Sequence, residues 1–433
     1  MAGGRFWFDV SYTRTQQATI GITRTVRRLF GEAQTLGETG ALAYHPQGFR
    51  EVILPEPAGR REVEAAPTFA QRLYRWVTGR IVWRLVIVAV RIVPWMLLRP
   101  AWELAANLVF GALSRTASRA RFRPNDIIVV ADVAWNYPAW RAARRAQRDG
   151  ARVVLLVHDL MPIRRPDFCF PLVPKVFVTF LHEMLRCCDA VVCNSRATEE
   201  DLRRWAQAQR ITLPPTGYFH LGSDVRPSAG STRARPEIED FLRAPGPCFA
   251  AVGSFEPKKN YALLVRVFER LWSGGSQARL LIAGMKTQEA AAFTEALRQH
   301  PLQGKLLMTV HDASDADIAE IYSGCQALVF PSLFEGFGLP LVEARTRGCR
   351  VVASDLPSFA ELADAGVTLY ARDDAEALAR ALQQVAQDTR TPPPYARGLT
   401  WRQSTEQFRL RCDALLAAPG VPQRLAAQEA LGG

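Results

Sequence analysis

The segment 327–343 limits the possible folds of this chain more than any other part of the sequence. It begins with an apolar run, 327–330, of the kind that forms a buried parallel strand. Gly336 and Gly338 follow in a loop, and Pro340 suits the first turn of a helix, where a missing N–H costs nothing. A strand, a glycine loop and a helix start together predict a parallel α/β sheet.

The same loop carries groups that suit a ligand. Backbone N–H groups at a helix start, helped by the helix dipole, attract an anion such as a phosphate, and the two glycines let it approach closely. Glu335 precedes the glycines, and Glu343 lies on the predicted helix. Carboxylates bind phosphate poorly, but they accept hydrogen bonds from sugar hydroxyls. The alternative is a capping arrangement without a ligand, because a motif is a hypothesis until its context agrees.

The wider sequence context favours the ligand. The pattern E-G-F-G-L-P-L-x-E from Glu335, followed by G-C-R-V-V-A-S-D-L-P-S-F-x-E from Gly348, resembles the nucleotide-sugar signature of the family 4 glycosyltransferases. This family consists of retaining enzymes with the α/β GT-B fold, in which two Rossmann-like doubly wound domains face a cleft. The resemblance implies that Glu335 lies against the donor sugar and that Glu343 holds the ribose hydroxyls. It also implies that backbone groups contact the donor diphosphate, at Gly336, Phe337, Gly338 and Leu339.

Composition and charge are compatible with such an enzyme. The 433 residues are enough for two domains, and the hydrophobic and charged contents of 48% and 22% are globular values. The net charge of +12 suits acidic partners such as a nucleotide diphosphate, nucleic acid or an anionic membrane surface. Because no recognisable module interleaves aromatic with basic residues, we expect no nucleic acid partner.

The cysteines do not indicate a metal site. Cys187, Cys188 and Cys193 form the only cluster among eight cysteines, and their spacing does not match zinc ligands. Cysteines beside an apolar strand are expected to fill the core. No signal peptide opens the sequence, so we expect a cytoplasmic protein. The resemblance implies no cofactor and no obligatory metal, and we expect the chain to lack the spacing Asp-x-Asp of a metal site.

Residues 1–225 alternate strands and helices as a Rossmann-like domain does. A helix is predicted from about Thr19 to Leu36, and by resemblance Gly21 at its start would contact the donor phosphates or the acceptor. Many relatives carry paired glycines at this point, so a helix start without a ligand is an equal alternative. Further apolar runs predict strands at 6–10, 127–130, 152–157 and 189–193, the last of which would end the sheet.

A histidine lies at a position suited to ligands. His158 and Asp159 directly follow the strand 152–157, and open α/β sheets bind ligands at the carboxyl ends of their strands. A lone histidine is more often structural. However, the cluster H-D-x-x-P resembles the acceptor-side histidine of the family, which implies that His158 lies near the reacting hydroxyl.

The second domain is predicted at 237–400, after a linker-like segment at 226–236. Its first strand, 248–252, leads into a segment that resembles the family sequence G-T-L-E-P-R-K-N and ends in the pair Lys258 and Lys259. A lysine beside a strand end suits a diphosphate, and Lys259 matches the family position.

This segment lacks one positive charge that many members of the family carry. Many members carry an arginine on the phosphate where this chain has Ser254, and Lys258 would compensate for it. The alternative is a solvated lysine pair. Residues 401–418 are expected to form a final helix, which in the family crosses back onto the first domain.

These observations predict a retaining glycosyltransferase that uses a nucleotide diphosphate sugar. Resemblance to bacterial mannosyltransferases of surface polysaccharide and lipopolysaccharide assembly makes GDP-mannose the first donor to consider, with a saccharide or a polyprenyl-linked saccharide as the acceptor. One alternative is a nucleotide-sugar epimerase of the same two-domain architecture, which would need no lipid acceptor. Another is a scaffold that binds a nucleotide sugar without catalysis.

The family motifs do not explain a basic and apolar helical insertion at about 65–120. Between residues 71 and 100 there are six arginines and no acid, with tryptophans among apolar residues. Pro94 and Pro100 should divide this segment into separate helices. One helical stripe carries three of the arginines: Arg80, Arg84 and Arg91.

This mixture of residues is typical of a helix in a membrane interface, so we expect the protein to bind the inner face of the cytoplasmic membrane peripherally. The alternative is a pair of buried helices whose arginines pair with acids elsewhere in the chain.

Overall fold

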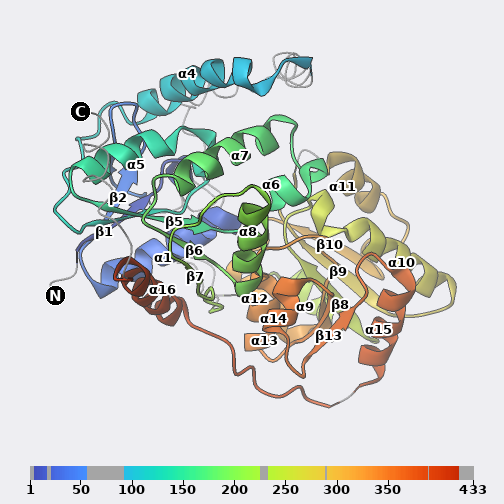
Figure 1. Cartoon of the computed structure of the whole chain (residues 1–433). Coiled ribbons are helices and arrows are strands. Elements are labelled where there is room, and N and C mark those ends of the chain that lie inside the picture. The colour runs from blue at the N-terminus through green and yellow to red at the C-terminus, as the bar shows by residue number, and fades with distance from the viewer. Residues whose placement is uncertain are drawn as a thin grey trace, which may run out of the picture. The chain divides into compact units, whose positions relative to one another are not determined.

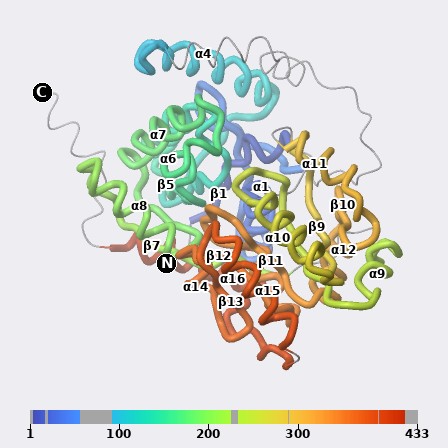
Figure 2. The backbone as a smooth tube through the Cα atoms, turned by 90° about the vertical axis from the view of Figure 1, so that its right-hand side faces the viewer, coloured from blue at the N-terminus to red at the C-terminus, as the bar shows by residue number. Residues whose placement is uncertain are grey.

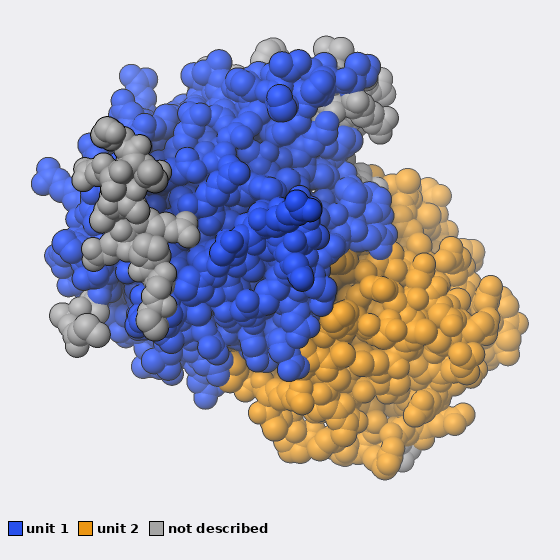
Figure 3. All heavy atoms as spheres, viewed as in Figure 1, with its two compact units in different colours: residues 1–220, 401–433 blue, residues 221–400 orange. Residues whose placement is uncertain are grey.

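A computed structural model describes residues 4–16, 21–55, 92–224, 233–287, 290–388 and 390–418 (Figures 1 and 2). The chain divides into two compact units, which Figure 3 shows in different colours. Unit 1 comprises Met1–His220 with Trp401–Gly433, and unit 2 comprises Leu221–Thr400. Most of the expected linker at 226–236 lies outside the described residues.

Unit 1 contains a seven-stranded sheet with the order β3-β2-β1-β4-β5-β6-β7. All neighbouring strands are parallel except β2 and β3. The strand order reverses between β1 and β4, and ligands of doubly wound sheets bind outside the carboxyl ends of the strands at such a switch point. The strands are β1 (Phe6–Asp9), β2 (Thr39–Ala43), β3 (Arg50–Val52), β4 (Ile127–Val130), β5 (Arg152–Val157), β6 (Ala190–Cys193) and β7 (Thr216–Tyr218).

Helices cover both faces of this sheet, with α1 and α16 on one face and α5 and α7 on the other (Figure 1). Ser195 caps α8 by accepting a hydrogen bond from the Thr198 N–H at 3.0 Å. The helices are α1 (Gly21–Leu36), α4 (Trp95–Leu113), α5 (Ala139–Arg148), α6 (Met161–Arg164), α7 (Leu172–Leu185), α8 (Arg196–Ala208) and α16 (Trp401–Leu416).

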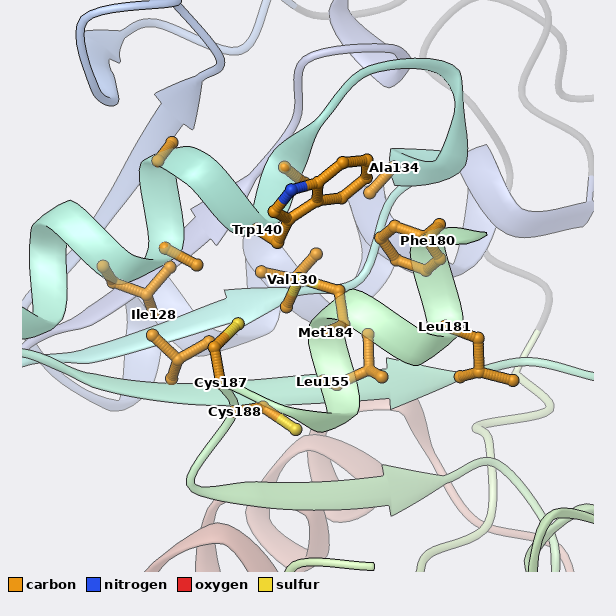
Figure 4. Close-up of a cluster of buried hydrophobic side chains, with 14 of the residues drawn as sticks. Ile128, Val130, Ala134, Trp140, Leu155, Phe180, Leu181, Met184, Cys187 and Cys188 are labelled. Atoms are coloured by element: carbon orange, nitrogen blue, oxygen red, sulfur yellow. The ribbon is translucent and has the colours of Figure 1, made fainter. Parts of the chain in front are cut away.

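One core layer of unit 1 lies between the sheet and the helices α5 and α7. Figure 4 shows Trp140 of α5 and Phe180 of α7 lying over sheet residues such as Val130. Cys187 and Cys188 are 5% and 1% exposed in the same cluster, which confirms that they fill the core. Burial raises the pKa of the Cys187 thiol to about 12, so this side chain stays a neutral apolar group.

Two predictions for unit 1 were wrong. Helix α4 runs through Pro100 instead of ending there. Pro100 is exposed and close to the helix start, so water can hydrate the carbonyl that loses its partner. The strand at 189–193 is not the last of its sheet, because β7 follows; its sequence, Thr-Gly-Tyr, carries no apolar run. The predicted stripe of Arg80, Arg84 and Arg91 lies outside the described residues.

Unit 2 repeats the architecture with a six-stranded, wholly parallel sheet of order β10-β9-β8-β11-β12-β13. Its switch point lies between β8 and β11, so the loops after these two strands meet there. The strands are β8 (Cys248–Val252), β9 (Arg279–Gly284), β10 (Leu307–His311), β11 (Ala327–Phe330), β12 (Arg350–Ser354) and β13 (Val367–Tyr370).

Helices alternate with the strands of unit 2. Helix α12 begins with a capping box, in which Ser314 and Asp317 each bond the other's backbone N–H. The helices are α9 (Pro236–Arg243), α10 (Tyr261–Ser273), α11 (Ala291–Arg298), α12 (Asp315–Gly324), α13 (Leu339–Thr346), α14 (Pro357–Leu362) and α15 (Ala375–Gln387). Among the residues that the structure describes, no helix has both the length and the apolarity needed to cross a bilayer.

Candidate active site

Two loops meet at the switch point of unit 2. One follows β8 and contains the short 3-10 helix Pro257–Lys259, and the other follows β11 and leads into α13. The Leu333 N–H donates to the Lys258 carbonyl oxygen at 2.8 Å, so the backbones of the two loops are tied directly. The segment that ends in Lys258 and Lys259 and the loop that contains Gly336 and Gly338 are therefore neighbours in the folded unit.

A buried ion pair joins the side chains of these loops. The Nζ atom of Lys259 lies 2.5 Å from Oε1 of Glu335, and the two side chains are 10% and 13% exposed. The ammonium also lies 4.9 Å from the centre of the Phe330 ring, which adds a cation–π contact. Burying either charge alone is costly, so each group fixes the position of the other.

Hydrogen bonds hold both the side chain and the backbone of Glu335. Ser332 Oγ donates to Oε1 of Glu335 at 2.9 Å, and Ser358 Oγ on α14 donates to the Glu335 carbonyl at the same distance. Burial by itself raises the pKa of Glu335. The charges of Lys259 and Lys258 and the bonds from Lys259 and Ser332 outweigh that effect and lower the pKa, so the carboxylate is ionised.

Glycines shape both loops. A Cβ atom on Gly338 would lie 2.8 Å from Phe359, and the φ angle of +121° at Gly338 is unfavourable for any other residue. Gly253, directly after β8, has a φ of +150°, and a Cβ there would lie 3.3 Å from the Lys259 side chain. Pro340 occupies the first turn of α13, as predicted.

The remaining residues of the β8 loop have their own partners. Ser254 Oγ donates to Oε1 of Glu256 at 2.7 Å, and the Lys258 ammonium lies 3.5 Å from the same carboxylate. Glu256, which was not predicted from the sequence, thus draws both side chains together. Lys258 is 18% exposed against 10% for Lys259.

Glu343 lies on α13 and is 1% exposed. Its Oε2 accepts a hydrogen bond of 3.1 Å from the Tyr322 hydroxyl of α12. Tyr322 was not predicted from the sequence. A tyrosine hydroxyl orients a buried carboxylate without adding charge.

His158 follows β5 in unit 1 and is 8% exposed. Its Nε2 lies 2.6 Å from the Ala131 carbonyl oxygen, and because a carbonyl only accepts, Nε2 carries the proton. Burial lowers the pKa of His158, which leaves the ring neutral and Nδ1 free of a proton. His158 lines a pocket with apolar side chains that include Trp135 and Phe177, and Ile22 of α1 lines it too.

Gly21 is the first residue of α1 and has a φ of +50°. Among the described residues, and apart from its chain neighbours and the backbone of its own helix, no heavy atom lies within 4 Å of the Cβ that an alanine would add. The backbone angle rather than crowding therefore favours glycine at this position. The residues 17–20 that precede it lie outside the described parts of the chain. A contact between Gly21 and the donor or the acceptor stays a prediction.

Sequence reasoning missed two carboxyl groups at the switch point of unit 1. Asp9 ends β1 and accepts a hydrogen bond from the Tyr137 hydroxyl at 2.8 Å, while Asp132 follows β4 and accepts from the N–H of Thr13 at 2.8 Å. Both aspartates are fully buried. Burial and then the charge of Asp132 raise the pKa of Asp9 to about 7. The sequence did carry a signal for them, because Asp9 and Asp132 each lie at or just after the end of an apolar strand.

The expectation that the chain lacks the spacing Asp-x-Asp was wrong. The spacing Asp-x-Asp does occur, at Asp315-Ala316-Asp317 on α12. Asp317 caps this helix and accepts from the Arg235 guanidinium at 3.0 Å, so it serves a structural role. Within the described residues, no three His, Cys, Asp or Glu side chains are grouped so as to hold a metal ion.

Comparison with known proteins identifies the family. The family model described as Glycosyltransferase Family 4 matches residues 28–218, and the model described as Glycosyl transferases group 1 matches residues 237–397. This chain is a family 4 glycosyltransferase. The two matches fall on units 1 and 2 respectively.

Two curated relatives of this glycosyltransferase are mannosyltransferases. The serotype-specific mannosyltransferase WbdA of Escherichia coli is 30% identical over 298 residues, which are 66% of this chain and 37% of that protein. The O-antigen chain mannosyltransferase RfbU of Salmonella typhimurium is 26% identical over 236 residues, 54% of this chain and 60% of RfbU. The chain therefore spans little more than a third of the length of WbdA.

Solved structures confirm the predicted fold. Sucrose-phosphate synthase from Thermosynechococcus elongatus aligns over 99% of this chain and 98% of its own, with a TM-score of 0.57 and 18% identity. With two parallel-sheet units of seven and six strands, the glycosyltransferase has the GT-B fold.

Proposed function

We propose that this glycosyltransferase moves a mannosyl group from GDP-mannose to a hydroxyl of a lipid-linked saccharide and retains the anomeric configuration. The observation that carries the proposal is the buried pair of Lys259 and Glu335 at the switch point of unit 2. It supplies a fixed cation for a diphosphate and a fixed carboxylate for a sugar. Similarity to WbdA and RfbU supports mannose as the sugar, and guanine is the first base to test.

On the donor side, the Lys259 ammonium has three N–H donors, of which the structure gives one to Glu335. The others would bind the diphosphate, together with backbone N–H groups at the start of α13, and would stabilise the charge of the leaving nucleotide. Lys258 would add charge at the loop. Glu335 would orient the sugar, and Glu343, held by Tyr322, would accept hydrogen bonds from the ribose.

On the acceptor side, neutral His158 would accept a hydrogen bond from the reacting hydroxyl through Nδ1, since Nε2 is bound to Ala131. Trp135 and Phe177 give its pocket an apolar wall, which suits the carbon face of a sugar ring. No metal is required in this scheme, so the chain's own cations would neutralise the donor diphosphate. The reaction would take place at the inner face of the cytoplasmic membrane, where the lipid-linked acceptor lies.

The experiment that tests the proposal has two stages. First, thermal unfolding is followed with a panel of nucleotide sugars, because a ligand that binds only the folded state stabilises it by mass action. GDP-mannose and GDP should raise the unfolding temperature, and UDP-glucose should not. Second, labelled GDP-mannose is offered with a polyprenyl-diphosphate-linked saccharide in the presence of EDTA, and the anomer of the product is read by NMR.

The expected result is lipid-bound mannose with the α configuration of the donor. An epimerase would instead convert the sugar of its donor without any lipid, and a scaffold would bind GDP-mannose without turnover. Stabilisation by UDP sugars alone would contradict the donor assignment, and an inverted product would contradict retention.

A further inference from the structure

The exposed side of α4 is entirely apolar. Four large side chains on it are between 62% and 81% exposed: Met96, Leu97, Leu104 and Leu108. The other exposed positions of this helix are Pro100 and three alanines, and Ile92 just before the helix is 75% exposed. A helix on the surface of a protein in water normally turns its polar residues outward, so this arrangement is the reverse of the usual one.

The charged residues of α4 face the protein instead. Arg99 donates to Glu103 at 2.8 Å and to Glu183 of α7 at 2.9 Å, and Arg141 of α5 forms a further ion pair with Glu103. Glu103 itself is 7% exposed. The charged residues of this inner face therefore form fixed ion pairs. For Arg99 this agrees with the alternative in which the arginines of this segment pair with acids elsewhere in the chain.

Aromatic contacts fasten the same inner face. The Trp95 indole N–H donates to Thr179 of α7 at 2.8 Å, and the rings of Trp102 and Trp140 stack with their centres 6.2 Å apart. Figure 1 shows α4 on the outside of the layer formed by α5 and α7, and Figure 2 shows it outside α7. The helix is thus anchored to unit 1 with its leucines pointing away from the unit.

The charge around α4 indicates which partner this face fits. Residues 65–125 contain ten arginines and a single acid, the buried Glu103, while the whole chain has a net charge of +12. Arg115, Arg119 and Arg121, which follow the helix, are exposed. Two copies of so basic a region would repel each other, whereas an anionic bilayer offers both an apolar interior for the leucines and phosphates for the arginines.

We propose that α4 docks this glycosyltransferase on an anionic lipid bilayer, with its leucines in the acyl boundary and the arginines that follow it among the headgroups. The contact differs from the arginine stripe expected from sequence, because the outward face of α4 itself carries no charge. The inference deepens the proposed function by naming how the chain reaches a lipid-linked acceptor. Docking can nevertheless be measured without donor or acceptor.

The test uses the full chain and vesicles of phosphatidylethanolamine with phosphatidylglycerol, separated by sedimentation. Leu104→Ser combined with Leu108→Ser should weaken vesicle binding by about 10-fold to 100-fold, since each side chain would lose much of its burial in lipid. Leu410→Ser is the matched control, because Leu410 of α16 is an equally exposed leucine in unit 1, at 68%. It should leave binding unchanged.

A second variant separates the charge from the apolar contact. Arg115→Gln, Arg119→Gln and Arg121→Gln together should reduce binding to anionic vesicles and make the remaining binding less sensitive to added salt. The leucine variant should keep its salt dependence. Vesicles of phosphatidylcholine alone should bind the wild type more weakly than anionic ones.

Three outcomes would overturn the inference. The leucine variant could bind vesicles as the wild type does. It could turn a dimeric wild type into a monomer, which would make this face an interface between copies. It could also lower the unfolding temperature by many degrees, which would mean that the chain itself covers the face. If α4 variants lose vesicle binding but still transfer mannose to a water-soluble acceptor, the docking proposal stands apart from the proposed function.

Discussion

Lys259 and Glu335 lie 76 residues apart in the sequence, yet their charged groups are 2.5 Å apart in a buried site. In the proposed function, this pair couples the stability of unit 2 to donor binding. A diphosphate bound to Lys259 would be a second anion beside Glu335, so the site must hold both negative groups around one ammonium. The start of α13 supplies the additional positive potential that this arrangement needs.

The first prediction concerns stability. Lys259→Ala leaves Glu335 buried without its cation and should reduce the free energy of unfolding by about 3–5 kcal/mol at pH 7. Adding Glu335→Gln to that variant should recover a large part of the loss, because a neutral amide needs no counter-charge. Urea denaturation of both variants and the wild type measures this. A double variant as unstable as the single one would show that the pair is not the source of the loss.

The second prediction concerns the donor diphosphate. Lys259→Ala should weaken GDP binding by about 1.5–3 kcal/mol, the range for a hydrogen bond to a charged group. Lys258→Ala is the matched comparison, and it should cost less because its ammonium interacts with Glu256. Isothermal titration with GDP gives both values, and the double variant of Lys259→Ala with Glu335→Gln serves if the single one is unstable. Equal losses for the two lysines would contradict the ranking.

The third prediction separates the two glutamates. Glu343→Gln should weaken binding of GDP and of GDP-mannose alike, if the carboxylate holds the ribose. Glu335→Gln should leave GDP binding nearly intact while kcat falls, if this carboxylate acts on the sugar. Titration calorimetry and steady-state kinetics on both variants decide the matter.

Tyr322→Phe provides the control for a purely structural role of Glu343, because it removes the hydroxyl that donates to this carboxylate. It should reduce GDP affinity less than Glu343→Gln does. If both glutamate variants lose GDP affinity equally, the division of roles is wrong.

Much of unit 2 could be predicted because its chemistry is local in sequence. The strand 327–330, the two glycines and Pro340 each have a backbone reason to be where they are, and the structure bears them out. The ion pair between Lys259 and Glu335 could not be predicted. The strand order β8-β11 creates it, and no short motif encodes the pairing of strands that are far apart in the chain.

The missed features share a physical cause. Asp9 and Asp132 become neighbours only because β1 and β4 are adjacent at the switch point of unit 1. The hydrogen bond from the Tyr12 N–H to Asp132 likewise joins residues that are 120 positions apart in the sequence. The outward apolar face of α4 was equally hidden. The sequence shows that this segment is rich in arginine. Only the packing shows that Arg99 points inward and that the leucines point outward.

The fourth prediction concerns Asp9 and the dependence of stability on pH. Its pKa is raised to about 7 in the folded chain, mainly by burial, whereas an unfolded aspartate titrates near 3.9. Between these values the folded state holds a proton that the unfolded state has lost. The contribution of Asp9 to the free energy of unfolding therefore falls as pH rises from about 4 to 7, by an amount on the order of 4 kcal/mol.

Asp9→Asn should flatten this part of the stability curve, because an amide does not titrate, while Asp132, whose pKa burial also raises, keeps a smaller slope of the same sign. The measurement is urea denaturation of the variant and the wild type at several values between pH 4 and 8. Asp149→Asn is the control, since its side chain in unit 1 is 45% exposed, and it should follow the wild type. Parallel curves for Asp9→Asn and the wild type would show that Asp9 is ionised in the folded chain throughout this range. The switch point of unit 1 would then hold no protonated carboxyl group at Asp9.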